Sequence, residues 1–481
     1  MMMEEPVQPD GEGRLDTVVA DGGWRHHFLT NGYCVLRHCV PSGDLQLIRE
    51  AVEVLAQRRI GGGGLPESYS SFRLSMADEV PSSEADRVVR FCLGPNTLGV
   101  SDQLVNRGLD GHSSTPVRHT TICLAIGVIC SGNDDHGATD WHRDASSSGQ
   151  APLGGMQRDM QANGVGYVQW NIALEDDEIF WLIPGSHRQP DSAALQQALL
   201  DDPCVEIHCG VPIKLQKGDG VVYSNVCLHW GSQYNSTPTR RTLHLSYRAI
   251  GVGAQQLLSK SHSAPGLEEP AFADAVPKDC GEHFRLAASL LTEERATMVT
   301  LFRAVIDRDE EGFDRALAAL HVGTEQRMVA VVLLSKIAKA VGVLCSSEIA
   351  HLPLDGRQAA LEASPNYHGS PDWPVCQAVS QFSPAEASVL VQRFSVLDMM
   401  LKREQAATEE ATHAAWLERR GGDGCTAVEW ASAGQPAYHA NTEWPDWEAR
   451  PLRTTHHAMP AMSVREFIGS WQHKDVGASK L

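Results

Sequence analysis

The pattern of apolar and polar positions predicts strands in the first half of the chain and helices in the second half. Short apolar runs bounded by polar turns are typical of buried strands, and they occur at residues 32–37, 120–129, 164–174 and 221–223. One amphipathic helix is predicted among them, ending near Arg58. Its apolar positions recur at helical spacing and are Leu45, Ile48, Val52 and Leu55.

Helical spacing dominates after residue 280. Helices are predicted from Thr292 through the apolar positions up to Ile306, then over 310–320 and 324–344. A further helix should begin at Ser383-Pro384-Ala385-Glu386, which combines a capping box with proline at the first helical position. We therefore expect a mainly α-helical region over residues 281–420, separated from the strands by a proline-containing linker at 259–280.

Both ends of the chain lack a clear period. Residues 1–21 are rich in Gly, Pro and acidic side chains, which predicts a disordered tail. Residues 421–481 are rich in Trp, Gly and Pro, and we interpret them as an irregular tail. That tail ends in Ser479-Lys480-Leu481, the tripeptide that the peroxisomal import receptor reads. We expect a peroxisomal protein if the source is a eukaryote, and a cytoplasmic protein otherwise.

Composition narrows the classes of partner. The 60 Asp and Glu residues outnumber the 40 Lys and Arg residues, so the formal net charge is −20. Such an acidic chain is a poor candidate for binding nucleic acid or an anionic membrane surface. No run of about 18 apolar residues predicts a membrane span. The 12 cysteines are scattered without a Cys-x-x-Cys pair, which favours buried reduced thiols over a disulfide framework or a zinc ribbon.

The candidate chemistry lies in His142-Arg143-Asp144. On a strand, residues i and i+2 project from the same face, so the imidazole and the carboxylate can reach one ion. A third ligand from another strand would complete two histidines and one carboxylate, a set that suits non-haem Fe(II) and leaves positions open for a co-substrate and oxygen. A His-x-Asp pair alone is weak evidence, because a satisfied polar pair on a strand has the same pattern.

Several further motifs follow this pair in a characteristic order. An apolar strand at 164–174 precedes Pro184-Gly185-Ser186-His187-Arg188, then a Gly-Asp turn at 217–220, then Leu228-His229-Trp230-Gly231-Ser232, with arginines just beyond. This order resembles the phytanoyl-CoA dioxygenase family of Fe(II)/2-oxoglutarate oxygenases over residues 22–258. The resemblance implies a double-stranded β-helix, or jelly-roll barrel, with flanking helices, giving an α+β fold class.

The resemblance also implies an activity and a set of roles. Fe(II) would be held by His142, Asp144 and His229. 2-Oxoglutarate would be anchored by Arg240, and Ser232 would be a second contact for this co-substrate. With O2, the enzyme would hydroxylate a small-molecule or lipid substrate and release succinate and CO2. A peroxisomal location would fit an acyl-CoA substrate.

Two assignments stay open at this stage. This chain has Trp230 where the family usually has glycine directly after the metal histidine, so a bulge could move Arg241 into the role of Arg240. The activity itself has two alternatives: an idle jelly-roll that serves with the helical region as a scaffold, and a metal site that holds zinc, or iron without 2-oxoglutarate.

The remaining motifs receive structural interpretations. We interpret His187 and His244 as structural residues, and His456-His457 as a surface pair. The Ser-, Gly- and Gln-rich residues 145–163 are predicted to be a mobile segment over the substrate.

Overall fold

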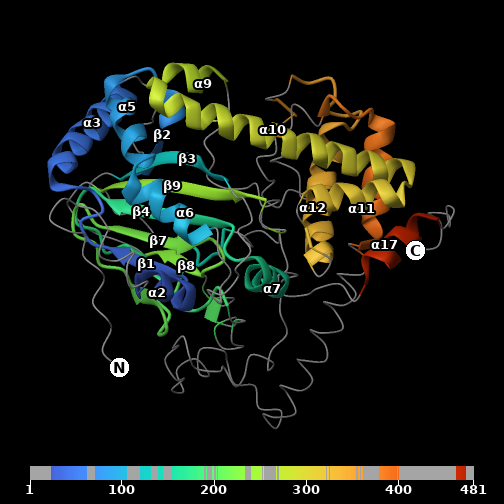
Figure 1. The fold of residues 1–481 in the computed structure, drawn as a ribbon, viewed down its shortest axis with the longest axis horizontal. Helices are drawn as coiled ribbons and strands as arrows, with labels where there is room; N and C mark the ends of the chain where they lie inside the picture. Colours follow the sequence, from blue (N-terminus) through green and yellow to red (C-terminus); the bar gives the residue numbers. More distant parts are fainter. Residues whose placement is uncertain are drawn as a thin grey trace, which may run out of the picture.

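The computed structural model combines helices with antiparallel sheets (Figure 1). It describes residues 23–61, 71–105, 120–131, 139–144, 153–188, 204–232, 240–251, 270–320, 326–353, 379–397 and 462–472, together with single residues between them. Three predicted features lie outside the described residues: the targeting signal at 479–481, the His456-His457 pair and the disordered tail at 1–21. No described helix is both long enough and apolar enough to cross a lipid bilayer.

A six-stranded antiparallel sheet forms the centre of the strand-rich half. Its strands lie side by side in the order β1 (Tyr33–Leu36), β7 (Gly220–Ser224), β4 (Tyr167–Ala173), β9 (Arg240–Ile250), β3 (Thr120–Ser131) and β2 (Ser71–Ser75). The strands predicted at 32–37, 120–129, 164–174 and 221–223 are confirmed. The long pairings of β9 with β3 and β4 place residues from widely separated segments next to one another.

A three-stranded sheet packs on the larger one. It consists of β6 (Val211–Pro212), β5 (Phe180–Leu182) and β8 (His229–Gly231). The two sheets share an apolar cluster that includes Tyr33 and Tyr223 from the large sheet and Phe180 and Leu182 from the small one. We call the side of the large sheet that faces this cluster the inner face.

The described strands do not close into the jelly-roll barrel that the sequence predicts. Both β1 and β2 are edge strands with one neighbour each, and no described strand joins the two sheets. Residues 139–144, where a joining strand would run, make only a single bridge to β8 through His142. The coarser prediction, helices packed on antiparallel sheets, is correct.

The sequence of β9 separates the two faces of the large sheet. Leu243, Leu245 and Tyr247 alternate with polar residues and pack into the main core with the helices. The polar residues between them therefore point to the inner face, because successive side chains on a strand point to opposite sides. Thr242 shows this directly: it lies opposite Ala173, which belongs to the cluster between the two sheets. The polar residues of the inner face are Arg240, Thr242, His244, Ser246 and Arg248.

Helices of the first half cover the outer face. They are α2 (Gly23–Asn31), α3 (Ser42–Gly61), α4 (Met76–Glu79), α5 (Ser83–Cys92), η1 (Pro95–Gly99), α6 (Val100–Val105) and α7 (Leu153–Asn163). The predicted helix ending near Arg58 corresponds to α3. Residues 153–163 were predicted to be mobile, and this is wrong, because Leu153, Met156 and Met160 of α7 are buried in the core. Their i, i+3, i+7 spacing is a helical signal that the surrounding Gly and Gln residues obscured.

The described part of the second half is mainly helical, as predicted. It contains α9 (Pro270–Ala275), α10 (Lys278–Asp307), α11 (Glu310–Ala319) and α12 (Arg327–Leu344), and residues 384–397 are also helical. The capping box is present: the backbone N–H of Ser383 donates to Glu386 Oε2 at 2.8 Å. The linker prediction is wrong for residues 270–280, because α9 begins at Pro270 and α10 begins at Lys278, directly after the N-cap residue Pro277. Proline fits the first turn, where its missing N–H would have no helical partner.

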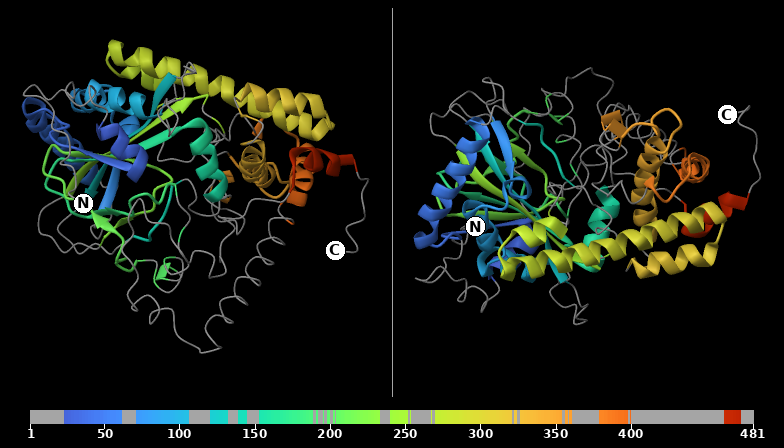
Figure 2. Two further views of the ribbon diagram at one scale, coloured as in Figure 1. Left: turned by 60° about the horizontal axis from the view of Figure 1, so that its bottom comes forward. Right: turned by 90° about the horizontal axis from the view of Figure 1, so that it is seen from above.

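The helical half and the sheets share one core. Figure 2 shows α10, a helix of 30 residues, running from the large sheet to the other helices. The predicted irregular tail is also wrong in part. Within it, α17 (Val464–Gly469) and η6 (Ser470–Gln472) are packed, with the Phe467 ring 5.3 Å from that of Phe394 and the Trp471 ring 5.4 Å from that of Phe313.

Candidate metal centre

The three predicted metal ligands lie close together, where residues 139–144 run beside β8. They are His142, Asp144 and His229. His142 and His229 exchange two backbone hydrogen bonds of 3.0 Å, which lock residues 139–144 against β8. His229 Nε2 lies 3.4 Å from Asp144 Oδ2, and His142 Nε2 lies 3.9 Å from Asp144 Oδ1. One candidate ligand atom from each residue lies within 4.8 Å of the others. The three residues predicted as ligands therefore form a group that could hold a metal ion.

The hydrogen bonds of the two imidazoles fix which nitrogen faces the centre. His142 Nδ1 lies 2.6 Å from the carbonyl oxygen of Asp140, and His229 Nδ1 lies 2.9 Å from that of Cys227. A carbonyl oxygen can only accept, so each Nδ1 carries the proton and donates. In a neutral ring, Nε2 then keeps its lone pair, which is the arrangement that metal-binding histidines use.

The centre is closed on one side and open on the other. His229 and Asp144 are buried, whereas the His142 side chain is 34% exposed. The rings of Tyr223 and Phe180 lie 5.0 and 5.6 Å from the His229 ring and shield it from the side of the sheets. A ligand or co-substrate would reach the metal from the side of His142.

Trp230 does not disturb the register of β8. The three residues of β8 pair in continuous order with β5, so there is no bulge at this position. Because Trp230 points away from His229, its ring stacks on that of Trp141 at 5.3 Å instead. The extra tryptophan therefore anchors the segment that precedes the His142–Asp144 pair.

Arg143 fixes the segment 139–144, which carries two of the predicted metal ligands, through hydrogen bonds on its other side. The sequence alone did not predict this role. Its buried guanidinium donates to the carbonyl oxygen of Val226 at 2.9 Å through Nε and to Asp191 Oδ2 at 2.8 Å through Nη1. The sequence does contain a feature that indicates this role. Arg143 stands between two predicted ligands, so on a strand its side chain would point away from the metal. A charge in that position must find a buried partner.

Arg240 and Arg241 point to opposite faces of the large sheet. Arg240 lies on the inner face, where its Nε donates to Asp177 Oδ2 at 2.7 Å. Arg241 lies on the outer face and pairs with Glu53 of α3 at 3.1 Å. Of the two arginines, only Arg240 therefore lies on the inner face, the side on which His229 contacts Tyr223 and Phe180. Ser232 follows β8 directly, half-buried, and its N–H donates to the carbonyl oxygen of Ile179 at 2.9 Å.

His187 and His244 hold internal hydrogen bonds, in agreement with their structural interpretation. His187 Nε2 lies 3.1 Å from the carbonyl oxygen of Leu29, and burial lowers the pKa of His187 to about 3. His244 Nδ1 lies 2.8 Å from Asn171 Oδ1 on the neighbouring strand. Neither histidine belongs to the metal-binding group found among the described residues.

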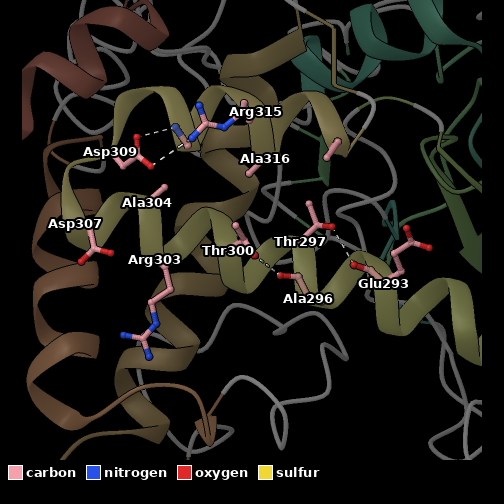
Figure 3. A pocket seen from close by; sticks show the side chains of 12 residues that line it. Glu293, Ala296, Thr297, Thr300, Arg303, Ala304, Asp307, Asp309, Arg315 and Ala316 are labelled. Atoms are coloured by element: carbon pink, nitrogen blue, oxygen red, sulfur yellow. Dashed lines mark hydrogen bonds and ion pairs between the residues drawn. The ribbon is translucent and has the colours of Figure 1, made fainter.

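A groove on α10 and α11 is the other hollow of note (Figure 3). Several of its polar groups have partners within the helices: the hydroxyls of Thr297 and Thr300 donate to carbonyl oxygens of their own helix, and Arg315 lies 3.7 Å from Asp309. The groove contains none of the residues predicted for the site.

Comparison with known proteins finds similarity only among solved structures. No protein-family model and no curated protein sequence matches the chain. A crystal structure of AviO1 from Streptomyces viridochromogenes Tue57 is similar over 47% of this chain and 94% of its own, at 17% identity and a TM-score of 0.34. The epimerase SnoN in complex with Fe3+, alpha ketoglutarate and nogalamycin RO covers 48% and 85%, at 15% identity and a TM-score of 0.30.

HygX from Streptomyces hygroscopicus, with nickel and 2-oxoglutarate bound, covers 47% of this chain and 86% of its own, at 15% identity and a TM-score of 0.34. Two of these three structures thus contain a metal ion together with 2-oxoglutarate, and this chain has a His-Asp-His group that could hold iron. All three TM-scores are below 0.5, so the functional interpretation rests on the residues of this chain.

Proposed function

We propose that the chain is an Fe(II)- and 2-oxoglutarate-dependent dioxygenase that hydroxylates a small-molecule or lipid substrate and releases succinate and CO2. The observation that carries the proposal is the pair of imidazoles, each held through Nδ1 by a backbone carbonyl oxygen, whose Nε2 atoms converge with Asp144. Two histidines and one carboxylate leave positions free on iron, as this reaction requires. The two sheets would be the halves of a double-stranded β-helix within an oxygenase domain of residues 22–258.

Each residue of the site has a defined part in this proposal. His142, Asp144 and His229 hold Fe(II), which together with 2-oxoglutarate and O2 supplies the oxidising chemistry when bound. Arg240 binds the far carboxylate of 2-oxoglutarate, because a guanidinium offers a permanently charged planar fork. Asp177 holds that fork in place through Nε. The guanidinium of Arg240 has no other partner among the described residues, and its two terminal nitrogens would bind the co-substrate.

One observation favours a second candidate, a metal site that does not use 2-oxoglutarate. The ion pair with Asp177 already neutralises the charge of Arg240 on the inner face. If Arg240 served only this pair, its replacement would leave the affinity for 2-oxoglutarate unchanged. Binding of 2-oxoglutarate to the Arg240 variant therefore separates the two candidates.

Succinate release tests the proposed activity. The native protein, supplied with Fe(II), 2-oxoglutarate and O2, should form succinate, and Asp144→Ala should not. Glu178→Ala is the control, because it removes an exposed carboxylate that pairs with the exposed Lys214 and does not belong to the metal-binding group. Equal succinate release by the native protein and Asp144→Ala would contradict the proposal. An acyl-CoA substrate and a peroxisomal location stay predictions from the sequence.

A further inference from the structure

Three buried polar atoms on the inner face lack hydrogen-bond partners. They are Gln169 Oε1 on β4 and, on β9, Ser246 Oγ and Arg248 Nε. Each of these residues is at most 2% exposed, and no described residue supplies the missing bond. A buried polar atom without a partner is unfavourable, because it has lost its hydrogen bonds to water and gained none in return. Such atoms in a native protein indicate a missing ligand or water.

The three residues form one cluster beside the metal centre. Gln169 and Ser246 are direct cross-strand partners, and Arg248 is two residues further along the same face of β9. On its other side, Gln169 is the cross-strand partner of Tyr223, whose ring contacts His229. Arg240 lies at the opposite end of β9. The cluster and Arg240 therefore lie toward opposite ends of one strand.

The helical half closes this cluster. Arg248 forms an ion pair with Glu294 of α10, and both residues are buried. Ala287 and Leu291 of the same helix pack against Ile122 and Tyr167, which come from the same end of the sheet. Glu294 neutralises the guanidinium, so the cluster offers a donor at Arg248 Nε, an acceptor at Gln169 Oε1 and a hydroxyl at Ser246, with no net charge.

We propose that Gln169, Ser246 and Arg248 form the substrate subsite of this enzyme, and that it binds an uncharged hydrogen-bonding group, a hydroxyl or an amide. This inference rests on the proposed function, because it treats the metal group as the reacting centre. Burial makes the subsite selective, since a site built for hydrogen bonds rejects a group that leaves them unmade. An anionic group would meet the carboxylate of Glu294, and an alkyl chain would leave all three polar atoms unsatisfied. Helix α10 thus takes part in substrate recognition.

Fragment binding to the full-length, zinc-loaded protein tests the inference by saturation-transfer NMR. The neutral probes are methyl glucoside, inositol and acetamide, and the comparison probes are acetate, methyl phosphate and hexane-1,6-diamine. The native protein should bind neutral probes in preference. Ser246→Ala and Gln169→Leu should each weaken that binding about tenfold, the loss expected from one hydrogen bond of about 1.4 kcal/mol.

Glu294→Gln gives the sharpest outcome. It keeps the shape of the side chain but leaves the Arg248 charge unbalanced, so the preference should move to acetate and methyl phosphate. Circular dichroism of each variant confirms folding. Unchanged selectivity in Glu294→Gln, or native binding restricted to the charged probes, would overturn the inference. Because these measurements need neither iron nor turnover, they are independent of the succinate assay: fragment binding without succinate release contradicts the proposed function, and succinate release without this selectivity contradicts the subsite.

Discussion

Replacing Arg240 with Gln should weaken the binding of 2-oxoglutarate by about two orders of magnitude. The terminal nitrogens of Arg240 would make two charge-assisted hydrogen bonds to the far carboxylate of 2-oxoglutarate, and Gln can replace at most one of them with a neutral bond. Hydrogen bonds to charged groups contribute about 1.5–3 kcal/mol each. A loss of about 3 kcal/mol raises the dissociation constant roughly 150-fold. Gln can still donate to Asp177, which keeps this buried carboxylate paired and the fold intact.

Arg241→Gln is the matched control, because it removes the same charge from the adjacent position on the outer face. Arg241 is buried but its partner Glu53 is 48% exposed, so the carboxylate that loses its partner stays in contact with water. We expect the 2-oxoglutarate affinity of Arg241→Gln to stay within about twofold of native. Calorimetric titration of the metal-loaded proteins measures both constants. A change of less than about threefold in Arg240→Gln, or a larger loss in Arg241→Gln, would refute the assignment of Arg240.

Three further predictions concern stability. Arg143→Met should lower the free energy of unfolding by about 3–5 kcal/mol in urea titrations, because it leaves its carboxylate partner buried without a counter-charge; the exposed Arg90→Met should cost less than about 1 kcal/mol. Burial lowers the pKa of His283 to about 4, so native stability should fall as the pH drops from 6.5 toward 4, and His283→Gln should reduce that fall. Phe467→Ala should cost about 3–5 kcal/mol, since the ring is fully buried, whereas the exposed Arg465→Ala should have almost no effect; equal losses would contradict the docking of α17.

The sequence predicted those parts of the site that depend on local geometry. His142 and Asp144 are two residues apart, a spacing that on a strand gives a common face, and the structure brings both side chains to one centre although this segment forms only a bridge at His142 and a turn at Asp144. His229 needed the order of motifs around it, because a single histidine after an apolar run has no distinguishing local feature. Which of Arg240 and Arg241 points to the inner face depends on the register of β9 against β4 and β3, which neighbouring residues do not determine.

Long-range contacts could not be predicted from the sequence either, because neighbouring residues do not determine them. Nothing near Arg143 identifies Asp191 as its partner, and nothing near Arg248 indicates that a glutamate of α10 lies against it. The failure to predict the helix over 153–163 has a different cause. Its glycines and polar residues weaken the local helical signal, and burial of its apolar side chains in the core overrides that weak propensity.

Anaerobic titration of the Fe(II)-loaded protein with 2-oxoglutarate tests the central proposal most directly. Chelation of iron by 2-oxoglutarate gives a weak visible charge-transfer band, which reports binding before any reaction. We predict that the native protein develops this band, that Asp144→Ala and His229→Ala lose it, and that Arg240→Gln needs a much higher concentration of 2-oxoglutarate to form it. A folded, iron-loaded native protein without the band, or a band of equal strength in Asp144→Ala, would contradict the account.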